Sequence, residues 1–449
     1  MIAPLIRALP CGTPVAVLAA ALAATIGSAA SAQIDIQPVT SPGGIDAWLV
    51  EDDAIPFTAL ELRFKGGASL DADGKRGATN LMTALLEEGA GDLDSQAFSI
   101  AVEELAARFS FDVGDDTVAV SAQFLSENRD AALELLRLAI TEPRFDDADI
   151  ERVRAQVQSG IASDLLDPDT ISSETYAELA FPDHPYGTAI DGTADSVAGL
   201  TRDDLVAAKA NVMTRDRVFV GAVGDITAAE LGPILDALLG ELPEVGAPLP
   251  ENTNVAFDGG LTIVDFDTPQ SVITFGHRGI ARDDPDFFPA FVVNQIIGGG
   301  GFNSRLMEEV RRERGLTYGI YAALIDKSFA DMVIGRVSTV NERVGETVEV
   351  LREEWRRIGA DGITQEELDR VKTYLTGAYP LRFDGNQRIA NILVGMQVDG
   401  MPIDYVNTRN AQVDAVTLED ANRVAAALYR PEDLHLVIVG QPEGLEPGN

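Results

Sequence analysis

Cysteine and histidine are almost absent from this chain of 449 residues, which has one cysteine, Cys11, and three histidines. A single cysteine cannot form an internal disulfide or a thiolate zinc site. The histidines, His184, His277 and His435, stand in different segments, and no two have the i, i+4 spacing that lets one helix present two imidazoles to a metal. We therefore expect a fold held by packing and no metal site in this chain.

Basic residues are also scarce, since 34 Lys and Arg stand against 72 Asp and Glu, for a net charge of −38. This charge repels nucleic acid and anionic membrane surfaces, and it favours cationic partners at low salt. A plainer interpretation is solubility in a saline habitat. We expect neither nucleic acid nor a membrane surface as a partner.

Long apolar runs are missing everywhere except near the N-terminus. Arg7 precedes the apolar run 15–26, and "SAASAQ" then offers a small-residue cleavage site after Ala32. This pattern predicts a signal peptide over residues 1–32 and an exported protein, periplasmic or secreted. An uncleaved N-terminal anchor is the alternative, although the apolar run is short for a membrane span.

The chain contains an internal repeat at a separation of about 216 residues. "VAGLTRDDL" from Val197 matches "VDAVTLEDA" from Val413, and "DRVFVGAVGD" from Asp216 matches "EDLHLVIVGQ" from Glu432. "FDDADIERVRAQV" in the first half likewise matches "ITQEELDRVKTYL" in the second, and strand-like runs ending at Gly open both halves. Each half therefore has the same order of strands, helices and a final buried strand.

This repetition predicts the α+β class, with two homologous units that each have a mixed or antiparallel sheet flanked by helices. A polar stretch with three prolines, "LPEVGAPLPENTN", separates the two halves. We expect the first unit over residues 33–241, a linker over 242–257 and the second unit over 258–449.

Three stretches together resemble the pitrilysin/insulinase zinc peptidases, or inverzincins, over essentially the whole mature chain. They are "FKGGASLDADGKRGATNLMTALLEEGA", "FPDHPYGT" and "GGGGFNSRLMEEVRRERGLTYGIYAAL". The length and the two-half build are most similar to the short, two-chain branch that includes the mitochondrial processing peptidase and bacterial relatives. The resemblance implies that this chain forms half of a clamshell-like chamber.

In this family the motif H-x-x-E-H places two zinc-binding His on one helix face, with a Glu that activates the metal-bound water. The resemblance puts Asn80 and Ala84 at the two His positions, Thr83 at the Glu position and the third ligand near Gly160. None of these side chains can do the work of the residue that it replaces. We therefore expect no catalytic zinc here, and we interpret the following Glu87 and Glu88 as a solvated helix end.

The second half keeps a different part of the family's site. Arg311 and Tyr318 match a paired Arg and Tyr that, in the family, bind the substrate backbone opposite the zinc and stabilise the developing oxyanion. Arg312 and Arg314 compete for the arginine role. The plainer alternative is a basic helix end, a Gly C-cap and a core tyrosine.

Four consecutive glycines, Gly298, Gly299, Gly300 and Gly301, precede this region. The stretch lacks the Lys-Ser/Thr of a phosphate-binding P-loop and the spacing of a dinucleotide fingerprint. We interpret it as a substrate-binding loop beside a peptide cavity, with a simple flexible turn as the alternative.

These features predict a non-catalytic, substrate-binding subunit of a heterodimeric peptidase. The partner is expected to be a homologous H-x-x-E-H-bearing subunit that holds zinc, while this chain contributes Arg311 and Tyr318 to a site that acts on peptides. The alternative is a pseudo-peptidase that binds peptides or serves as a scaffold without a catalytic partner, for example as a homodimer. An active peptidase with a relocated site comes last, because the sequence offers no ligands for it.

Overall fold

The computed structural model describes residues 34–445. The predicted signal peptide over residues 1–32, with Cys11, lies outside the described residues and stays a prediction. From Ile36 onwards the chain forms one compact unit. Within residues 34–445, none of the helices combines the length and apolar character that a membrane span requires.

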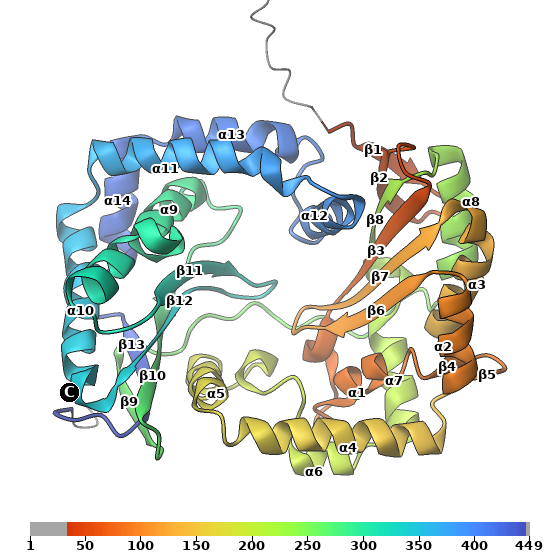
Figure 1. Cartoon of the computed structure of the whole chain (residues 1–449), viewed down its shortest axis with the longest axis horizontal. Coiled ribbons are helices and arrows are strands. Elements are labelled where there is room, and N and C mark those ends of the chain that lie inside the picture. Colours follow the sequence, from red (N-terminus) through yellow and green to blue (C-terminus); the bar gives the residue numbers. More distant parts are fainter. Residues whose placement is uncertain (1–33, 446–449) are drawn as a thin grey trace, which may run out of the picture. The chain divides into compact units, whose positions relative to one another are not determined.

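The first half of the chain builds a six-stranded mixed sheet with the strand order β1-β2-β8-β3-β7-β6 (Figure 1). Its strands are β1 (Gln37–Thr40), β2 (Asp46–Glu51), β3 (Phe57–Lys65), β6 (Arg108–Val113), β7 (Thr117–Leu125) and β8 (Val218–Gly224). The short strands β4 (Gly89–Ala90) and β5 (Leu93–Asp94) form a separate hairpin. Strands β2 and β8 run parallel, whereas the other neighbours in the large sheet are antiparallel.

The second half builds a five-stranded mixed sheet with the order β9-β13-β10-β12-β11. Its strands are β9 (Gly260–Asp265), β10 (Gln270–Arg278), β11 (Ile320–Asp326), β12 (Asp331–Val340) and β13 (His435–Gly440). Strands β9 and β13 are again the parallel pair, and β13 inserts between β9 and β10 as β8 inserts between β2 and β3. Apart from the additional edge strand β1, the two sheets share one topology, which confirms the predicted α+β class with two homologous units.

Helices accompany both sheets in the same order. In the first half they are α1 (Ala78–Ala84), α2 (Ser95–Glu104), α3 (Arg129–Thr141), α4 (Asp147–Asp164), α5 (Pro168–Ala180), α6 (Ala194–Ala198), α7 (Arg202–Val212) and α8 (Ala228–Leu239). In the second half they are α9 (Phe287–Asn294), α10 (Val344–Asp361), α11 (Gln365–Ala378), α12 (Asn386–Val398), α13 (Tyr405–Ala415) and α14 (Leu418–Leu428). The repeated threonines Thr201 and Thr417 cap the equivalent helices α7 and α14, because each hydroxyl accepts a backbone N–H of the first turn.

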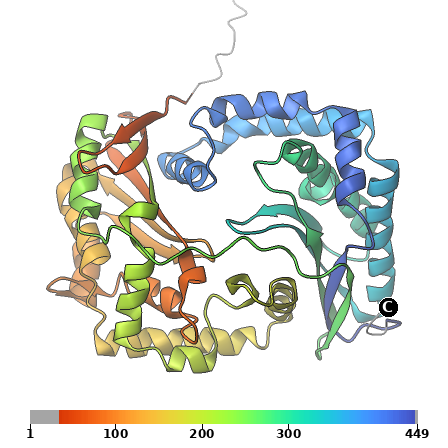
Figure 2. The same cartoon turned by 180° about the vertical axis from the view of Figure 1, so that it is seen from behind.

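The two halves exchange one helix each. Helix α5 of the first half packs on β10 and β13 of the second sheet, and α12 of the second half packs on β3 and β8 of the first sheet (Figure 2). At Gly221 of β8, an added Cβ would lie 2.6 Å from the backbone oxygen of Ala390 in α12. The exchanged helices cover the second face of each sheet, so the central strand β10 is buried on both faces along most of its length.

Polar contacts fix α12 on the first sheet. Gln397 donates its side-chain amide to the carbonyl oxygen of Val220 at 2.8 Å. The carboxylate of Glu61, fully buried in β3, pairs with Arg63 at 2.8 Å and accepts a hydrogen bond from Gln387 of α12. Burial raises the pKa of Glu61, against the lowering effect of Arg63. This buried carboxylate therefore needs its partners from both halves.

The segment 242–257 runs from α8 to β9 and is held by backbone hydrogen bonds to both halves. Ala247 donates to the carbonyl of Asn211 at 3.1 Å, and Thr253 donates to that of Phe329 at 2.8 Å. These contacts and the exchanged helices connect the two halves into one compact unit. The domain boundaries at 241 and 258 therefore stay a prediction.

The core of the second half contains a buried histidine. The ring of His277 on β10 lies against Trp355 of α10 and Tyr429, with ring centroids 6.1 and 5.7 Å away. Its Nδ1 is 2.8 Å from the carbonyl oxygen of Arg278, while Nε2 has no partner among the described residues. Burial lowers the pKa of His277 to about 4, because this site cannot solvate an imidazolium ion.

His277 is expected to make stability depend on pH. Its ordinary pKa of about 6.5 applies to the unfolded chain, which therefore takes up the proton first as the pH falls. The stabilising effect is present above pH 6.5 and is lost as the pH falls towards the folded-state pKa of about 4. Between pH 7 and pH 5 the loss amounts to about 2 kcal/mol. Urea unfolding at both pH values gives the change in the free energy of unfolding between pH 7 and pH 5. This change should be smaller by about 2 kcal/mol in His277→Leu than in the wild-type protein. An equal change in the two proteins would contradict the assignment.

Candidate functional site

Helix α1 begins at a turn that its sequence prepares. Gly77 has a φ of 95°, and an added Cβ would lie 2.5 Å from the carbonyl oxygen of Asp191. The carboxylate of Asp71 then accepts the backbone N–H groups of Gly77 at 2.9 Å and Thr79 at 2.8 Å, together with the Thr79 hydroxyl at 2.6 Å. One face of the helix buries Leu81 and Met82 in the first-half core. The sequence-predicted helix is therefore confirmed as a core element.

The residues at the expected metal-binding positions are engaged otherwise. Asn80 donates its amide to Asp191 Oδ1 at 2.7 Å, and the buried Thr83 hydroxyl donates to the carbonyl of Thr79 at 2.8 Å. Ala84 has no donor atom, and Gly160 is exposed on α4, which packs against α1. The four positions thus lie on adjoining helices as the resemblance implies, but their chemistry does not fit zinc. Within residues 34–445, no three His, Cys, Asp or Glu side chains are placed to hold a metal ion.

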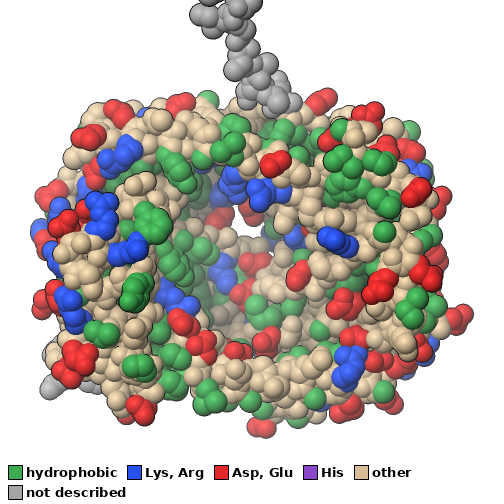
Figure 3. Space-filling model, viewed as in Figure 1, with side chains coloured by type: hydrophobic (Ala, Val, Ile, Leu, Met, Phe, Trp, Pro, Cys, Tyr) green, Lys and Arg blue, Asp and Glu red, His purple; other side chains and the backbone are tan. Residues whose placement is uncertain are grey.

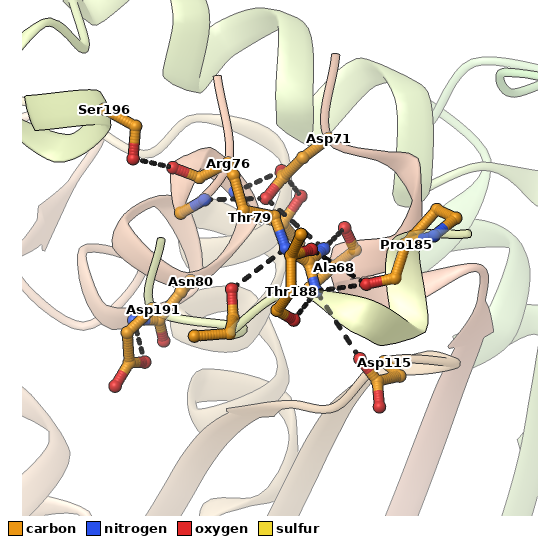
Figure 4. Close-up of polar contacts among 12 residues, drawn as sticks. Ala68, Asp71, Arg76, Thr79, Asn80, Asp115, Pro185, Thr188, Asp191 and Ser196 are labelled. Atoms are coloured by element: carbon orange, nitrogen blue, oxygen red, sulfur yellow. Dashed lines mark hydrogen bonds and ion pairs between the residues drawn. The ribbon is translucent and has the colours of Figure 1, made fainter. Parts of the chain in front are cut away.

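Arg76, just before α1, is the centre of a hydrogen-bond network (Figure 4). Its guanidinium donates to the carbonyl oxygens of Ala189 at 2.9 Å, Thr188 at 3.0 Å and Ala68, and it lies 3.5 Å from the carboxylate of Asp115. These bonds gather three chain segments around the start of α1. Each of the three guanidinium nitrogens of Arg76 therefore has a carbonyl partner. The network makes this region a structural junction.

The same junction reaches the second half of the chain. Asp115 also pairs with Lys327 of the β11–β12 turn at 2.6 Å. Asp116 accepts the backbone N–H of Ser328 at 3.0 Å and the hydroxyl of the buried Tyr186 at 2.5 Å. Tyr186 belongs to the stretch "FPDHPYGT", so this stretch has a structural role between the two halves.

Carboxylates near α1 do not replace the missing site. Burial, followed by the charge of Asp164, raises the pKa of Asp191, the partner of Asn80. Glu87 is exposed as predicted, but it lies in the turn beyond α1, which ends at Ala84. For Glu88 that prediction is wrong, because its carboxylate is partly buried, pairs with Arg152 at 2.5 Å and accepts the Ser95 hydroxyl at 2.5 Å. These partners come from two other helices, because Ser95 is the first residue of α2 and Arg152 lies on α4.

Gly298 and Gly299 end the π-helical segment Gln295–Gly299, and Gly300 and Gly301 lie between it and a second one, Met307–Glu313. Such π-helical segments are often found at functional sites. Gly298 is buried, and an added Cβ would lie 2.5 Å from the backbone nitrogen of Ala322 in β11. Gly301 has a φ of 58°, in the left-handed region, and faces open space. Gly299 and Gly301 are exposed and Gly300 is partly exposed. Substrate binding by this loop stays a prediction, whereas the packing role of Gly298 is visible.

The three neighbouring arginines differ in their partners. Arg312 pairs with Glu308 and Arg314 pairs with Glu309, both at 2.5 Å. Arg311 has no carboxylate partner among the described residues, and its guanidinium lies over the ring of Phe302, 4.8 Å from the centroid. Of the three, only Arg311 thus remains free of an ion pair within residues 34–445.

Tyr318 is 90% exposed, so the alternative of a core tyrosine is wrong, although Gly315, with a φ of 59°, does end the helix as expected. The hydroxyl of Thr317 donates to the carbonyl of Ser338 at 2.7 Å, which fixes the backbone beside Tyr318. Tyr318 and Phe302 line the same pocket of about 400 Å³. Arg311, stacked on Phe302, therefore stands at the border of the pocket that Tyr318 lines.

Among the lining residues that sequence reasoning missed are two large aromatic side chains and a charged one, namely Phe302, Tyr321 and Arg336. Phe302 and Tyr321 are 66% and 51% exposed, which is unusual for large aromatic side chains. Tyr321 on β11 lies directly opposite Arg336 on β12. Because side chains alternate between the two faces of a strand, an inward Ile320 and Ala322 would have placed Tyr321 outside. The pairing of Tyr321 with Arg336 depends on the strand register, which the sequence does not give.

Comparisons with known proteins relate both halves of the chain to the same family of peptidases. A family model described as "Insulinase (Peptidase family M16)" matches residues 48–193, and one described as "Peptidase M16 inactive domain" matches residues 199–375. The "Non-peptidase homolog YmxG" of Helicobacter pylori is 26% identical over 87% of this chain and 90% of its own length. The "Mitochondrial-processing peptidase subunit beta" of Lentinula edodes is 22% identical over 85% of this chain and 84% of its own.

The solved structures agree with the sequence comparisons. The crystal structure of a peptidase M16 inactive domain from Pseudomonas fluorescens matches with a TM-score of 0.86 and 27% identity, over 92% of this chain and 100% of that chain. The structure of a protease from Helicobacter pylori, with 16% identity and a TM-score of 0.80, shares the fold. Both matches extend across the two sheets and the exchanged helices.

Proposed function

Because this chain belongs to the M16 family of insulinase-type peptidases and is a non-catalytic member of it, we propose that it is the peptide-binding subunit of a two-chain peptidase. The partner is a homologous subunit with an intact H-x-x-E-H motif and zinc. This chain contributes Arg311 and Tyr318 from the opposite wall of the chamber. With its predicted signal peptide, the pair works outside the cytoplasm.

The observation that carries this proposal is the contrast between Arg311 and its neighbours. In a chain with 72 acidic residues, Arg312 and Arg314 have carboxylate partners while Arg311 has none within the described part. Tyr318 is 90% exposed with no hydrogen bond from its hydroxyl among the described residues. A large exposed aromatic ring and an unpaired guanidinium at one pocket do not stabilise the fold, so a ligand is their best explanation.

The chemistry of the two side chains suits a peptide backbone. A guanidinium is always charged and presents planar donors, and a phenol donates a hydrogen bond without a full charge. Together they can bind a peptide carbonyl oxygen and stabilise negative charge that develops there. In this pair of subunits the bond-breaking groups belong to the partner, and this chain orients the peptide.

The edge strand beside Tyr318 supports a peptide ligand. Strand β11 follows Tyr318 after Gly319 and is the outer strand of the second sheet. An edge strand has unpaired backbone N–H and C=O groups, to which an extended peptide can add as a further strand. A peptide paired there would pass the pocket of Tyr318 and Phe302.

Coexpression tests the proposed pairing. The candidate partner is encoded by a neighbouring reading frame with a signal peptide and an intact H-x-x-E-H motif. The two mature chains are expected to copurify as a heterodimer with one zinc per pair and chelator-sensitive peptidase activity, because each chain holds only part of the site. This chain alone should bind no zinc and cleave no peptide. Chelator-sensitive cleavage by the purified chain alone would overturn the proposal.

The second candidate is a peptide-binding protein that works without a catalytic partner. The relative named "Non-peptidase homolog", which aligns over most of this chain, favours it. In that case the chain purifies as a monomer or homodimer, binds unfolded peptides and gains no activity from any H-x-x-E-H-bearing chain. Size-exclusion chromatography of the coexpressed chains separates the two candidates.

A further inference from the structure

A second pocket, of about 620 Å³, lies among α9, α12, α13 and the turn between α11 and α12. It shares no lining residue with the pocket of Tyr318. Four arginines line it, Arg282, Arg382, Arg388 and Arg409, against a single carboxylate, that of Asp399. In the space-filling view, basic side chains gather at the edge of the hollow between α9 and α12 (Figure 3).

None of these four arginines forms an ion pair among the described residues, although acidic residues outnumber basic ones by two to one in the chain. Arg382 and Arg388 are exposed and have no hydrogen-bond partner in the described part of the chain. Arg423 on α14 shows the usual arrangement, because it pairs with Asp286 at 2.5 Å and Asp420 at 3.2 Å. The pocket thus concentrates positive charge that the protein does not neutralise.

Aromatic rings hold two of the guanidinium groups in place. Arg282 lies over Phe287, 4.9 Å from the ring centroid, and Arg409 lies over Tyr379 at 4.6 Å. The side chain of Arg409 is buried and donates to the carbonyl oxygen of Leu375 at 2.9 Å. A buried guanidinium without a carboxylate is costly for the folded protein, and an anionic ligand would offset that cost.

The charge of the whole chain does not prevent an anion from binding here. At physiological ionic strength, charges more than about 8 Å apart on the surface are largely screened from each other. The local arrangement of four guanidinium groups therefore decides which ion the pocket prefers. Because these groups are all positively charged, the pocket prefers an anion. The aromatic side chains of the pocket add an apolar surface for the rest of the ligand.

We propose that this pocket binds the C-terminal carboxylate of a peptide that ends in an apolar or aromatic residue. The planar fork of an arginine matches a carboxylate with two parallel hydrogen bonds, and the rings of Phe287 and Tyr379 pack with the terminal side chain. Asp399 provides an acceptor for a backbone N–H of the same peptide. The volume falls within the range of about 300–1,000 Å³ that is common for ligand sites.

That the occupant is a peptide rests on the proposed peptide-binding function, whereas the preference for a carboxylate rests on the pocket alone. The test uses the mature chain without a partner and a fluorescein-labelled pentapeptide ending in Phe, as a free acid and as a C-terminal amide. Fluorescence anisotropy is expected to give at least about 10-fold tighter binding of the acid, because a charge-assisted hydrogen bond is lost in the amide. Equal affinity of the two forms, or no binding of either, overturns the proposal.

Variants on the exposed rim of the pocket locate the site. Arg382→Gln and Arg388→Gln, each as a single variant, should weaken binding of the acid by about 10-fold and leave the amide unchanged. Arg370→Gln is the matched control, because Arg370 is also exposed and has no ion pair among the described residues but lies outside the pocket. If the control weakens the acid as much as the rim variants do, general charge attraction explains the binding and the pocket assignment fails.

Competition distinguishes a peptide terminus from a simple anion site. N-acetylphenylalanine should displace the labelled acid, whereas inorganic phosphate at the same concentration should not, since it has no apolar body. Equal displacement by phosphate would overturn the assignment to a peptide. The anisotropy test needs no partner subunit, so a failed heterodimer with intact binding here would contradict only the proposed function.

Discussion

Replacing Arg311 by alanine is expected to lower peptide turnover of the reconstituted heterodimer by roughly 100-fold, about the effect of removing one oxyanion donor. The effect should fall mainly on kcat, because the charge that Arg311 stabilises develops only as the peptide bond reacts. Its guanidinium has no ion pair among the described residues and lies over the ring of Phe302, 4.8 Å from the centroid, so the fold loses little. Steady-state kinetics of the purified pair provide the measurement.

Neighbouring residues provide controls for this experiment. Arg312→Ala removes the same charge one position away, but Arg312 is engaged with Glu308 and should change turnover by less than about 2-fold. Tyr318→Phe removes only the exposed hydroxyl and should cost 10- to 100-fold if that group donates to the substrate, as a rough estimate. Equal losses in the Arg311 and Arg312 variants would show that the pair needs general positive charge, and unchanged turnover in both would remove this chain from the catalytic site.

The sequence predicted the repeated framework well because the signals are local. Threonine caps, acidic first turns and buried strands ending at Gly recur at nearly constant spacing, and they fix the order of elements in both halves. The shared strand order follows from that repetition. Even so, the apolar positions in the sequences of α5 and α12 do not predict which sheet each helix covers, because an apolar helix face can pack on either sheet.

Contacts between distant segments explain the rest of what the sequence could not predict. From the sequence, Asn80 indicated only that a zinc ligand is missing. Its hydrogen bond to Asp191 could not be predicted, because it depends on the loop that Arg76 holds in place. Likewise, the resemblance selected Arg311 but left Arg312 and Arg314 as competitors, and their carboxylate partners in the structure distinguish them from Arg311. The arginine pocket was also invisible, because its lining comes from positions between 282 and 409 that no motif connects.

Restoring the metal ligands tests whether α1 still occupies the place of a zinc-binding helix. The triple variant Asn80→His, Ala84→His and Gly160→Glu is expected to bind about one zinc per chain, whereas the wild-type protein binds none. The i, i+4 spacing of the first two positions places both imidazoles on one helix face, and α4 with Gly160 packs against that helix. Calorimetry and the absorption spectrum of the cobalt derivative, which reports tetrahedral coordination, provide the measurements.

The surroundings are suited to these substitutions. An added Cβ at Gly160 meets no atom within 4 Å, so a glutamate side chain has room. Asp191, now bonded to Asn80 at 2.7 Å, can accept the second ring N–H of an imidazole at position 80 and orient it. The Asn80→His, Ala84→His double variant is the control, and with two ligands it should bind zinc at least about 10-fold more weakly.

The triple variant should bind zinc without becoming a peptidase. Thr83, at the position of the missing general base, is 2% exposed and its hydroxyl is bound to the Thr79 carbonyl. Thr83→Glu in addition would place a carboxylate in a buried site, so we expect the quadruple variant to melt at a lower temperature than the triple one. If the triple variant folds normally and still binds no zinc, α1 and α4 have moved apart from a chelating geometry, and this chain has lost the architecture of the site as well as its ligands.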